Sequence, residues 1–320
     1  MTTINPEKKK VLETIWAEIK KINWNEINAR SKKKFSLSII GNETFINMIQ
    51  LELKKTYGME TIAHSFGTRF KAKQNVDASL FKNSLICIDE ADIESKTGLI
   101  KTSDICIVSE EYFEKVRELN LNAYCFEGDF KELIEMIVNN NEEILPALSF
   151  CFPCFRVLAA NRAIQKVALQ NVVWVVGTAF PNLIPGPHQP VTAVVEGVSD
   201  FVALTTNEFR MMLEIVGLSG SIVSPFKIIV EVGFIYGLAN GAKWVATQIV
   251  GKAPAGTGLF VKGGVAFAFT HAIGQTVLLY QLTGKKTNVK GFIAGFKEIY
   301  TESRNFIKNF IEERIKKTSE

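Results

Sequence analysis

The sequence predicts a small α/β domain with a parallel sheet, followed by an all-α domain that contains long apolar helices. Two observations support this expectation. Between residues 34 and 140, short apolar runs that suit buried strands alternate with helical segments, which is the pattern of a parallel sheet. From Phe150 to Gly284 only 13 of 135 residues are charged, against 22% for the whole chain of 320. This length and an apolar content of 47% suit two domains with sizeable cores.

We expect four segments along the chain. They are an N-terminal amphipathic helix in 1–33, the α/β domain in 34–145, the helical domain in 146–284 and a basic amphipathic helix in 285–320. The first helix should run from Glu7 to about Ala29, because apolar residues recur at helical spacing at Val11, Ile15, Ile19 and Ile22. Such a helix packs on the following domain or lies on a membrane interface, and the sequence leaves both readings open.

Four apolar runs predict the strands of the α/β domain, and they cover residues 35–40, 84–88, 104–108 and 123–126. Helices are expected over 43–57 and 130–138. The junction between the first strand and the first helix is where a nucleotide-binding fold places its phosphate loop. That junction therefore decides whether this domain can bind a nucleotide.

A P-loop needs the pattern G-x-x-x-x-G-K-[ST], in which backbone amides and the Lys surround the phosphates. This chain has Gly41, Asn42, Glu43 and Thr44 at that place, which resembles the start of an Era-like GTPase with about four residues removed. The second Gly and the Lys are missing, and Glu43 puts a negative charge where a phosphate would sit. Neither an Asp-x-x-Gly motif after the second strand nor an Asn-Lys-x-Asp motif is present.

These departures predict a degenerate GTPase-like domain, a pseudo-GTPase with only a vestigial phosphate-loop position. We expect no catalytic residue, no cofactor, no metal and no enzymatic activity. The alternative is a GTP-binding switch that uses an unorthodox nucleotide pocket, with residual GTPase activity. That alternative rests on fold analogy alone.

Two further motifs favour structural roles. Residues 89–92 spell Asp-Glu-Ala-Asp, a helicase motif, but without a P-loop they predict only an acidic loop at a strand end. Cys151 and Cys154 form a C-x-x-C pair at the domain boundary, where a redox site would need a strand before it and zinc would need two more ligands. The other cysteines are scattered, which suits a reducing cytoplasmic compartment, and the N-terminus lacks the apolar core of a secretory signal.

The helical domain holds two long runs without charge, 167–195 and 263–284. Four prolines between Pro181 and Pro190 should end the first helix near Phe180, and a second helix should start near Gln189. Glycines at 233, 237 and 241 would allow close helix packing, in water or in lipid. The sequence leaves open whether these helices form a soluble bundle or insert into a membrane.

A group of polar residues in this apolar region predicts a buried polar network of structural importance. Its candidate members are Asp200, Asn207, Glu208, Arg210 and His271. No nucleophile–base pair and no paired-carboxylate site accompanies them, so we expect packing and hydrogen bonding rather than catalysis.

Several separated motifs of the helical domain occur in the order that is typical of one bacterial family. They are Phe152-Pro-Cys-Phe-Arg156, Gln170-Asn171, Leu183-Ile-Pro185, Thr205-Thr-Asn-Glu-Phe-Arg-Met211, Val261-Lys-Gly-Gly-Val-Ala-Phe267 and Thr270-His-Ala-Ile-Gly274. Residues 150–284 thus resemble the domain-of-unknown-function family found C-terminal to Era-like GTPase domains (YcjF-type). The resemblance implies a helical, often membrane-associated domain without an assigned catalytic residue.

The net charge of +4 is unevenly distributed: +5 in residues 1–34, −5 in 35–284 and +4 in 285–320. The basic ends suit an anionic membrane surface or another protein as partner, or they are simply the solvated faces of helices, and the sequence leaves these readings open. The absence of any nucleic-acid-binding motif argues against nucleic acid. The helix expected over 289–317 carries Phe292, Phe296, Phe306 and Phe310, which predicts packing on the body, on a second copy or on a membrane. We expect a cytoplasmic protein, peripheral or integral at the inner face of the cell membrane.

Overall fold

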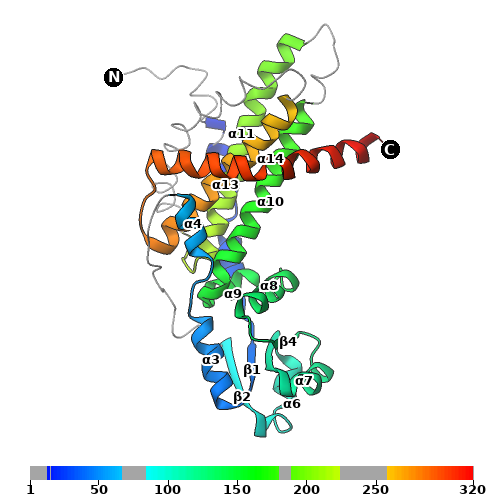
Figure 1. Cartoon of the computed structure of the whole chain (residues 1–320). Coiled ribbons are helices and arrows are strands. Elements are labelled where there is room, and N and C mark those ends of the chain that lie inside the picture. The colour runs from blue at the N-terminus through cyan, green and yellow to red at the C-terminus, as the bar shows by residue number, and fades with distance from the viewer. Residues whose placement is uncertain (1–12, 15, 67–83, 180–188, 224–257, 320) are drawn as a thin grey trace.

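The computed structural model describes residues 13–14, 16–66, 84–179, 189–223 and 258–319 (Figure 1). The predicted proline-rich turn after Phe180 lies outside these residues, as do the glycines at 233, 237 and 241 and the first turns of the N-terminal helix. For Asp200 the helical backbone is described, but not the side chain.

The sheet has four parallel strands in the order β2-β1-β3-β4. They are β1 (Leu37–Gly41), β2 (Leu85–Asp89), β3 (Ile105–Ser109) and β4 (Ala123–Phe126). Ile39 of β1 lies beside Cys87 of β2 and Ile107 of β3, and Ile107 lies beside Tyr124 of β4. Every residue of β1 is buried, as expected for a central strand. All four predicted strands are therefore present, within two residues of their expected bounds.

Helices cover both faces of the sheet. On one face α3 (Glu43–Leu53) and α8 (Phe130–Asn140) pack on Leu37, Ile39 and Ile107, and on the other α6 (Thr97–Thr102) and α7 (Phe113–Leu119) pack on Ile40 and Val108. Successive residues of β1 point to opposite faces of the sheet, because side chains alternate along a strand with a period of two. The α/β part of the prediction is thus confirmed, although α3 ends at Leu53 rather than at Tyr57.

The second part of the chain is a bundle of long helices. Helix α9 (Leu145–Cys151) leads into α10 (Pro153–Ala179), which packs with α11 (Gln189–Leu218) and α13 (Gly258–Thr283). Pro153 suits the first turn of α10, where its missing amide has no helical partner. Helix α14 (Val289–Ser319) lies across the bundle, and its C-terminal turns project beyond the rest of the described body (Figure 1). The bundle meets the α3 and α8 face of the sheet, with α4 (Met59–Ser65) against α13 and α14.

Several predicted helices have different bounds in the structure. The N-terminal helix is not continuous from Glu7 to Ala29: a turn at residues 21–23 separates helical residues 16–20 from α2 (Trp24–Ser31). The reason is local, because the side chain of Asn23 accepts a hydrogen bond from the backbone N–H of Glu26 and so begins a new helix. The helix expected to start near Gln189 is α11, and the C-terminal helix ends within two residues of its expected bound.

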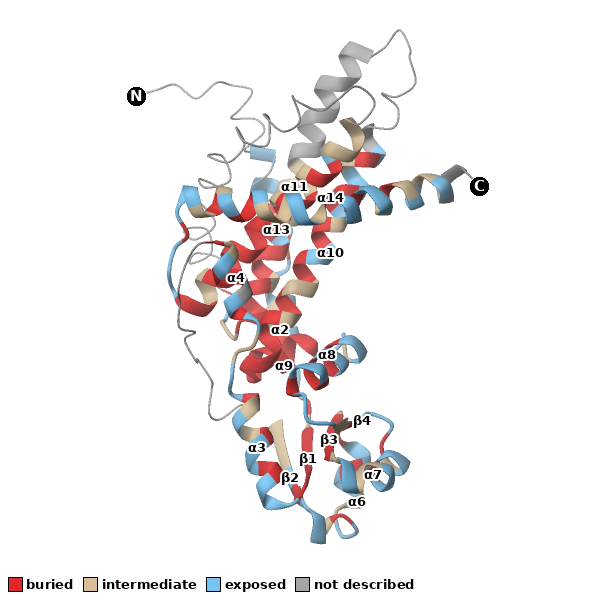
Figure 2. Cartoon of the chain, in the orientation of Figure 1, coloured by how far each residue is buried: buried red, intermediate tan, exposed pale blue. Residues whose placement is uncertain are grey.

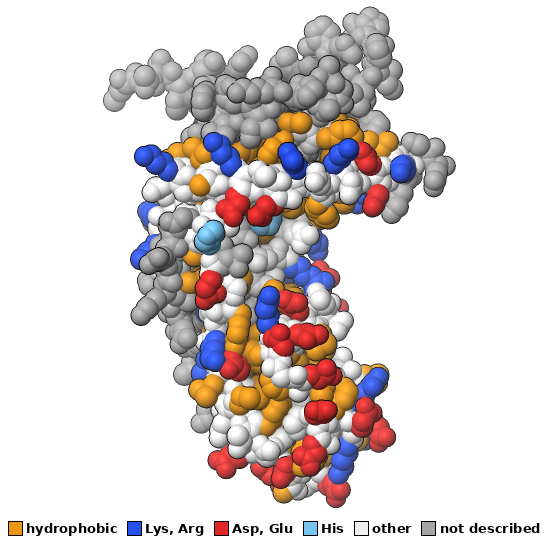
Figure 3. Space-filling view, in the orientation of Figure 1, with side chains coloured by type: hydrophobic (Ala, Val, Ile, Leu, Met, Phe, Trp, Pro, Cys, Tyr) orange, Lys and Arg blue, Asp and Glu red, His pale blue; other side chains and the backbone are white. Residues whose placement is uncertain are grey.

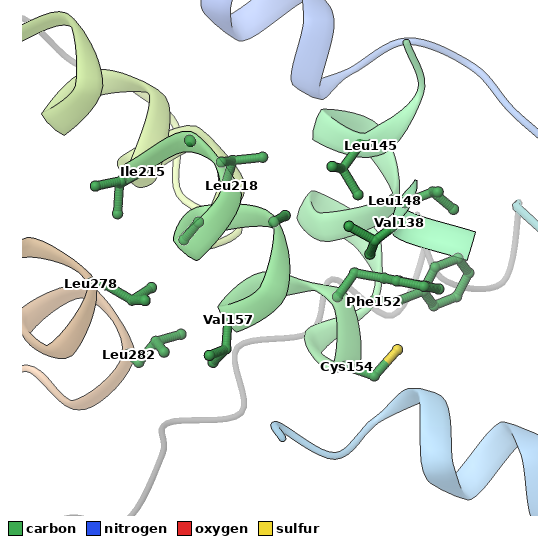
Figure 4. Packing of buried hydrophobic residues seen from close by; sticks show 14 of the residues in the cluster. Val138, Leu145, Leu148, Phe152, Cys154, Val157, Ile215, Leu218, Leu278 and Leu282 are labelled. Atoms are coloured by element: carbon green, nitrogen blue, oxygen red, sulfur yellow. The ribbon is translucent and has the colours of Figure 1, made fainter. Parts of the chain in front are cut away.

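One hydrophobic core runs from the sheet into the bundle (Figure 2). Figure 4 shows its middle, where Val138 of α8, Leu148 of α9, Phe152 and Val157 lie in one cluster with Leu218 and Leu278 of the long helices. The expected boundary at residue 145 falls on the first residue of α9, and the hydrophobic core continues across it.

Candidate functional site

The junction between β1 and α3 is a single residue, Asn42. Its side-chain oxygen accepts a hydrogen bond from the backbone N–H of Phe45 at 2.9 Å, so the chain caps its own helix N-terminus. Glu43 follows in the first helical turn, and both Glu43 and Thr44 are exposed. A phosphate would therefore meet a carboxylate and an N-terminus that already has an acceptor, instead of a loop of free amides.

The strand order places the ligand crevice of such a sheet between the carboxyl ends of β1 and β3. Here side chains fill that place. A methyl group added at Gly41 would come within 2.7 Å of Cδ1 of Phe45 and 3.0 Å of Oγ of Ser109. The ring of Phe45 packs in turn on Phe126 of β4, with ring centres 6.0 Å apart. The vestigial phosphate-loop position, Gly41 to Thr44, thus lies at a closed junction.

A hollow of about 670 Å³ lies on the outer face of α3 and is lined by Thr44, Asn47, Met48, Leu51, Glu52, Lys54 and Lys55. These side chains belong to one helix and its C-terminal end. Backbone amides inside a helix point along its axis and bond to the preceding turn. This hollow therefore offers no set of converging amides for a nucleotide.

The acidic loop of residues 89–92 organises its own backbone. Asp89 accepts a hydrogen bond from the N–H of Ala91 at 3.1 Å, and Asp92 pairs with Lys96 at 2.6 Å. Glu90 accepts a hydrogen bond from the hydroxyl of Tyr112 at 2.7 Å, and this bond is the main cause that raises the pKa of Tyr112 to about 12. These contacts give each acid a partner or a capping role, and the motif lies at the end of β2, where an acidic loop was expected.

A chain of buried hydrogen bonds connects three helices of the bundle. The amide of Asn207 on α11 donates to the side-chain oxygen of Asn171 on α10 at 2.9 Å. The amide of Asn171 donates to the hydroxyl of Thr270 on α13 at 2.9 Å, and Thr270 donates to Glu208 on α11 at 3.1 Å. Every donor points along the chain towards the carboxyl of Glu208, so the bonds polarise one another.

Two ionisable groups of this region have shifted pKa values. Burial raises the pKa of Glu208 from 4.5 to about 7, while the hydrogen bond from Thr270 acts in the opposite direction. Burial lowers the pKa of His271 from 6.5 to about 4. Its Nδ1 atom is buried without a hydrogen-bond partner among the described residues, and its ring lies 5.5 Å from that of Phe267. Burial thus favours the uncharged form of both groups, the neutral imidazole of His271 and the protonated carboxyl of Glu208.

The structure brings together part of the predicted polar network. Asn207 and Glu208 belong to it, and His271 is adjacent in sequence to Thr270. Arg210 is exposed on α11, and none of the hydrogen bonds of the network involves it. Sequence reasoning missed Asn171 and Thr270 as members, although each is a polar residue in a long run without charge, and buried polar groups need partners.

The Cys151 and Cys154 pair belongs to the core. Both cysteines are buried and neither forms a disulfide, and burial raises the pKa of Cys154 well above its usual value of 9.0. Beside them the fully buried Arg156 donates hydrogen bonds to the backbone carbonyls of Ser149 and Phe150, at the end of α9. Within the described ranges no group of three or more His, Cys, Asp or Glu residues could hold a metal ion. Cys151, Cys154 and Arg156 therefore hold together the junction between α9 and α10.

Two surface features belong to α14. Its basic stripe is formed by the exposed residues Lys290, Lys297, Arg304 and Lys308. A groove lies beneath its projecting end, against α10, as two hollows of about 600 and 380 Å³ that share Val173, Gly177, Phe310 and Arg314 (Figure 3). Trp174 at the groove is 42% exposed, and the guanidinium of Arg314 lies over the ring of Phe310 at 5.5 Å.

Among the described helices α13 alone is long and apolar enough to cross a membrane, judged by length and composition. Two thirds of its apolar window is buried against other helices, which is equally typical of the central helix of a soluble bundle. This helix is therefore weak evidence for a membrane span.

The chain was compared with family models, curated proteins and solved structures. No family model, no curated protein and no solved structure matches this chain.

Proposed function

We propose that this chain is a non-catalytic interaction protein that associates peripherally with a membrane, at its cytoplasmic face. Its α/β part is a GTPase-like domain that has lost nucleotide binding. One observation carries the proposal: the connection between β1 and α3 is the single residue Asn42, which caps α3 itself. A phosphate-binding loop has no room in a one-residue connection.

Two further observations support this function. The parallel order β2-β1-β3-β4 is compatible with an open α/β sheet of the kind that binds nucleotides, while the crevice between β1 and β3 is filled by Phe45 and Ser109. The motifs of residues 150–284 resemble a family of often membrane-associated helical domains, and α14 adds a row of exposed cations. A domain without nucleotide chemistry beside a basic surface suits recruitment or scaffolding.

Two measurements test the proposal. Isothermal titration calorimetry with GTP, GDP and ATP in the presence of magnesium should show no binding, and stoichiometric binding would refute the loss of nucleotide chemistry. Cell fractionation should place the protein with membranes at low salt and release it with a high-salt wash, because salt screens electrostatic attraction. Retention through a carbonate wash would point to insertion, and a wholly soluble protein at low salt would refute membrane association.

A second candidate function is an oligomeric scaffold in which α14 pairs with a second copy of the chain. The groove beneath the projecting end of α14 favours it, because Trp174 and Phe306, exposed by 42% and 48%, are large apolar side chains at or near this end. The projecting end of one copy could enter the groove of the other in a two-fold arrangement. Sedimentation equilibrium tests the oligomeric scaffold: a protein that is monomeric at all concentrations excludes it.

A further inference from the structure

We propose that the basic stripe of α14 binds an anionic phospholipid surface electrostatically and so orients the chain on the membrane. The inference rests on the proposed membrane association and names its contact surface.

The four cations of the stripe lie on one face of one helix. Lys290, Lys297, Arg304 and Lys308 are separated by seven, seven and four residues, which are close to whole turns of 3.6 residues. The stripe therefore extends over about 27 Å along α14. The body-facing side of the same helix is anchored by Phe292, Phe296, Ile307 and Ile311, all buried, so the helix cannot turn its cations inwards.

Most of these charges are not neutralised within the protein. Among the described residues no carboxylate lies within ion-pair distance of Lys290, Lys297 or Arg304, and the amine of Lys308 is 3.7 Å from Glu312. Figure 3 shows a row of Lys and Arg side chains along the upper edge of this region, with most of the nearby acidic side chains below the row. An anionic surface would therefore meet a mainly positive edge.

The stripe also lies at the apolar end of the bundle. The C-terminal end of α10 and the N-terminal ends of α11 and α13 all lie beyond α14, on the side away from the sheet (Figure 1). Residues 167–195, which include the C-terminal half of α10 and the first turns of α11, hold no charged residue. Proteins that bind anionic membranes commonly place Lys and Arg side chains at the border of an apolar region.

The opposite end of the molecule carries the opposite charge. The described residues of 34–145 hold eight basic and eighteen acidic side chains, a net charge of −10, whereas α14 holds seven basic and four acidic ones. An anionic surface attracts α14 and repels the sheet, so both forces favour the same orientation. The sheet would then point towards the cytoplasm, where it is free to contact a partner.

The test measures binding to phosphatidylcholine vesicles with and without phosphatidylglycerol, for the full chain and two variants. The first variant is K290Q/K297Q/R304Q/K308Q. The second is the charge-matched control K54Q/K55Q/K101Q/K131Q, whose exposed lysines lie at the sheet end. At about 1 kcal/mol per cation near an anionic surface, each cation contributes about fivefold in affinity, so the stripe variant should bind several hundredfold more weakly. Circular dichroism of both variants checks the fold.

The expected result is binding of the parent and the control to anionic vesicles only, at about 0.1 M salt but not at about 1 M. The proposal fails if the stripe variant binds like the parent, or if the parent binds neutral vesicles equally well. It also fails if the parent binds no vesicle, even if α14 binds some other polyanion. If the parent is nevertheless found in the membrane fraction of cells, the proposed function stands and only this contact surface is wrong. A soluble parent refutes both.

Discussion

Glu208→Gln should make the protein more stable than the parent above pH 7 and lose this advantage below about pH 4.5. Burial raises the pKa of Glu208 in the folded chain to about 7, while the unfolded chain keeps the usual value of 4.5. Between these two values the folded state binds more protons than the unfolded state, so its stability falls as the pH rises. The Gln side chain does not ionise and can still accept the hydrogen bond from Thr270.

The size of the effect follows from the two pKa values. A difference of about 2.5 pH units, at about 1.36 kcal/mol per unit, gives a ceiling of about 3 kcal/mol above pH 7. Glu208 as a residue keeps part of its surface exposed, so we expect roughly 1–2 kcal/mol after solvent screening. The low pKa of His271, about 4, destabilises both proteins as the pH falls below 6.5, and it cancels in the difference between them.

The assay is urea unfolding of the parent and the variant at several pH values from 5 to 8, with the free energies compared at each pH. Glu302→Gln, at an exposed carboxylate on α14, is the control and should give a difference that does not change with pH. A constant difference between parent and Glu208→Gln over this range would show that the carboxyl is ionised throughout, and would refute the argument from burial.

Three further predictions concern the junction and the packing of the bundle. Asn42→Ala removes the cap of α3 and should cost about 1 kcal/mol in urea unfolding without creating nucleotide binding in calorimetry; an undiminished stability would contradict the capping role. Gly274→Ala should cost about 1–3 kcal/mol, because the new Cβ would lie 2.5 Å from Ile164, whereas Gly177→Ala in the partner helix meets no atom within 4 Å and should stabilise by about 0.5–1 kcal/mol. Phe296→Ala should cost about 3–5 kcal/mol and Phe306→Ala less than about 1 kcal/mol, since the first ring is fully buried and the second is 48% exposed; equal thermal shifts would contradict the observed face of α14.

The strands and the long helices could be predicted because their signals are local. Each strand is a short apolar run, and α14 carries phenylalanines at helical spacing in two pairs, at 292 and 296 and at 306 and 310. The break before α2 was missed because the apolar period continues through Asn23, and only the capping bond of that residue shows where one helix ends. A periodic pattern reports which side of a helix is buried, but not whether the helix is continuous.

The polar network was predicted only in part, because its members lie far apart in the sequence. Asn207 and Glu208 were recognisable as polar residues in an apolar region, whereas their partners Asn171 and Thr270 lie 36 and 62 residues away along the chain. No sequence spacing encodes such contacts. The exposed position of Arg210 depends on how α11 is turned in the bundle, and that rotation is set by packing on α10 and α13.

The shared core has a consequence for how the molecule unfolds. A GTPase domain that works as a module has its own core and can be excised, but here Leu37 of the central strand and Leu278 of α13 belong to one cluster of buried side chains. Cutting the chain near residue 145 would expose apolar surface on both pieces, at about 25 cal/mol for each Å². The sheet and the bundle should therefore unfold in one cooperative transition. A force or a partner that destabilises one of them will also lower the stability of the other.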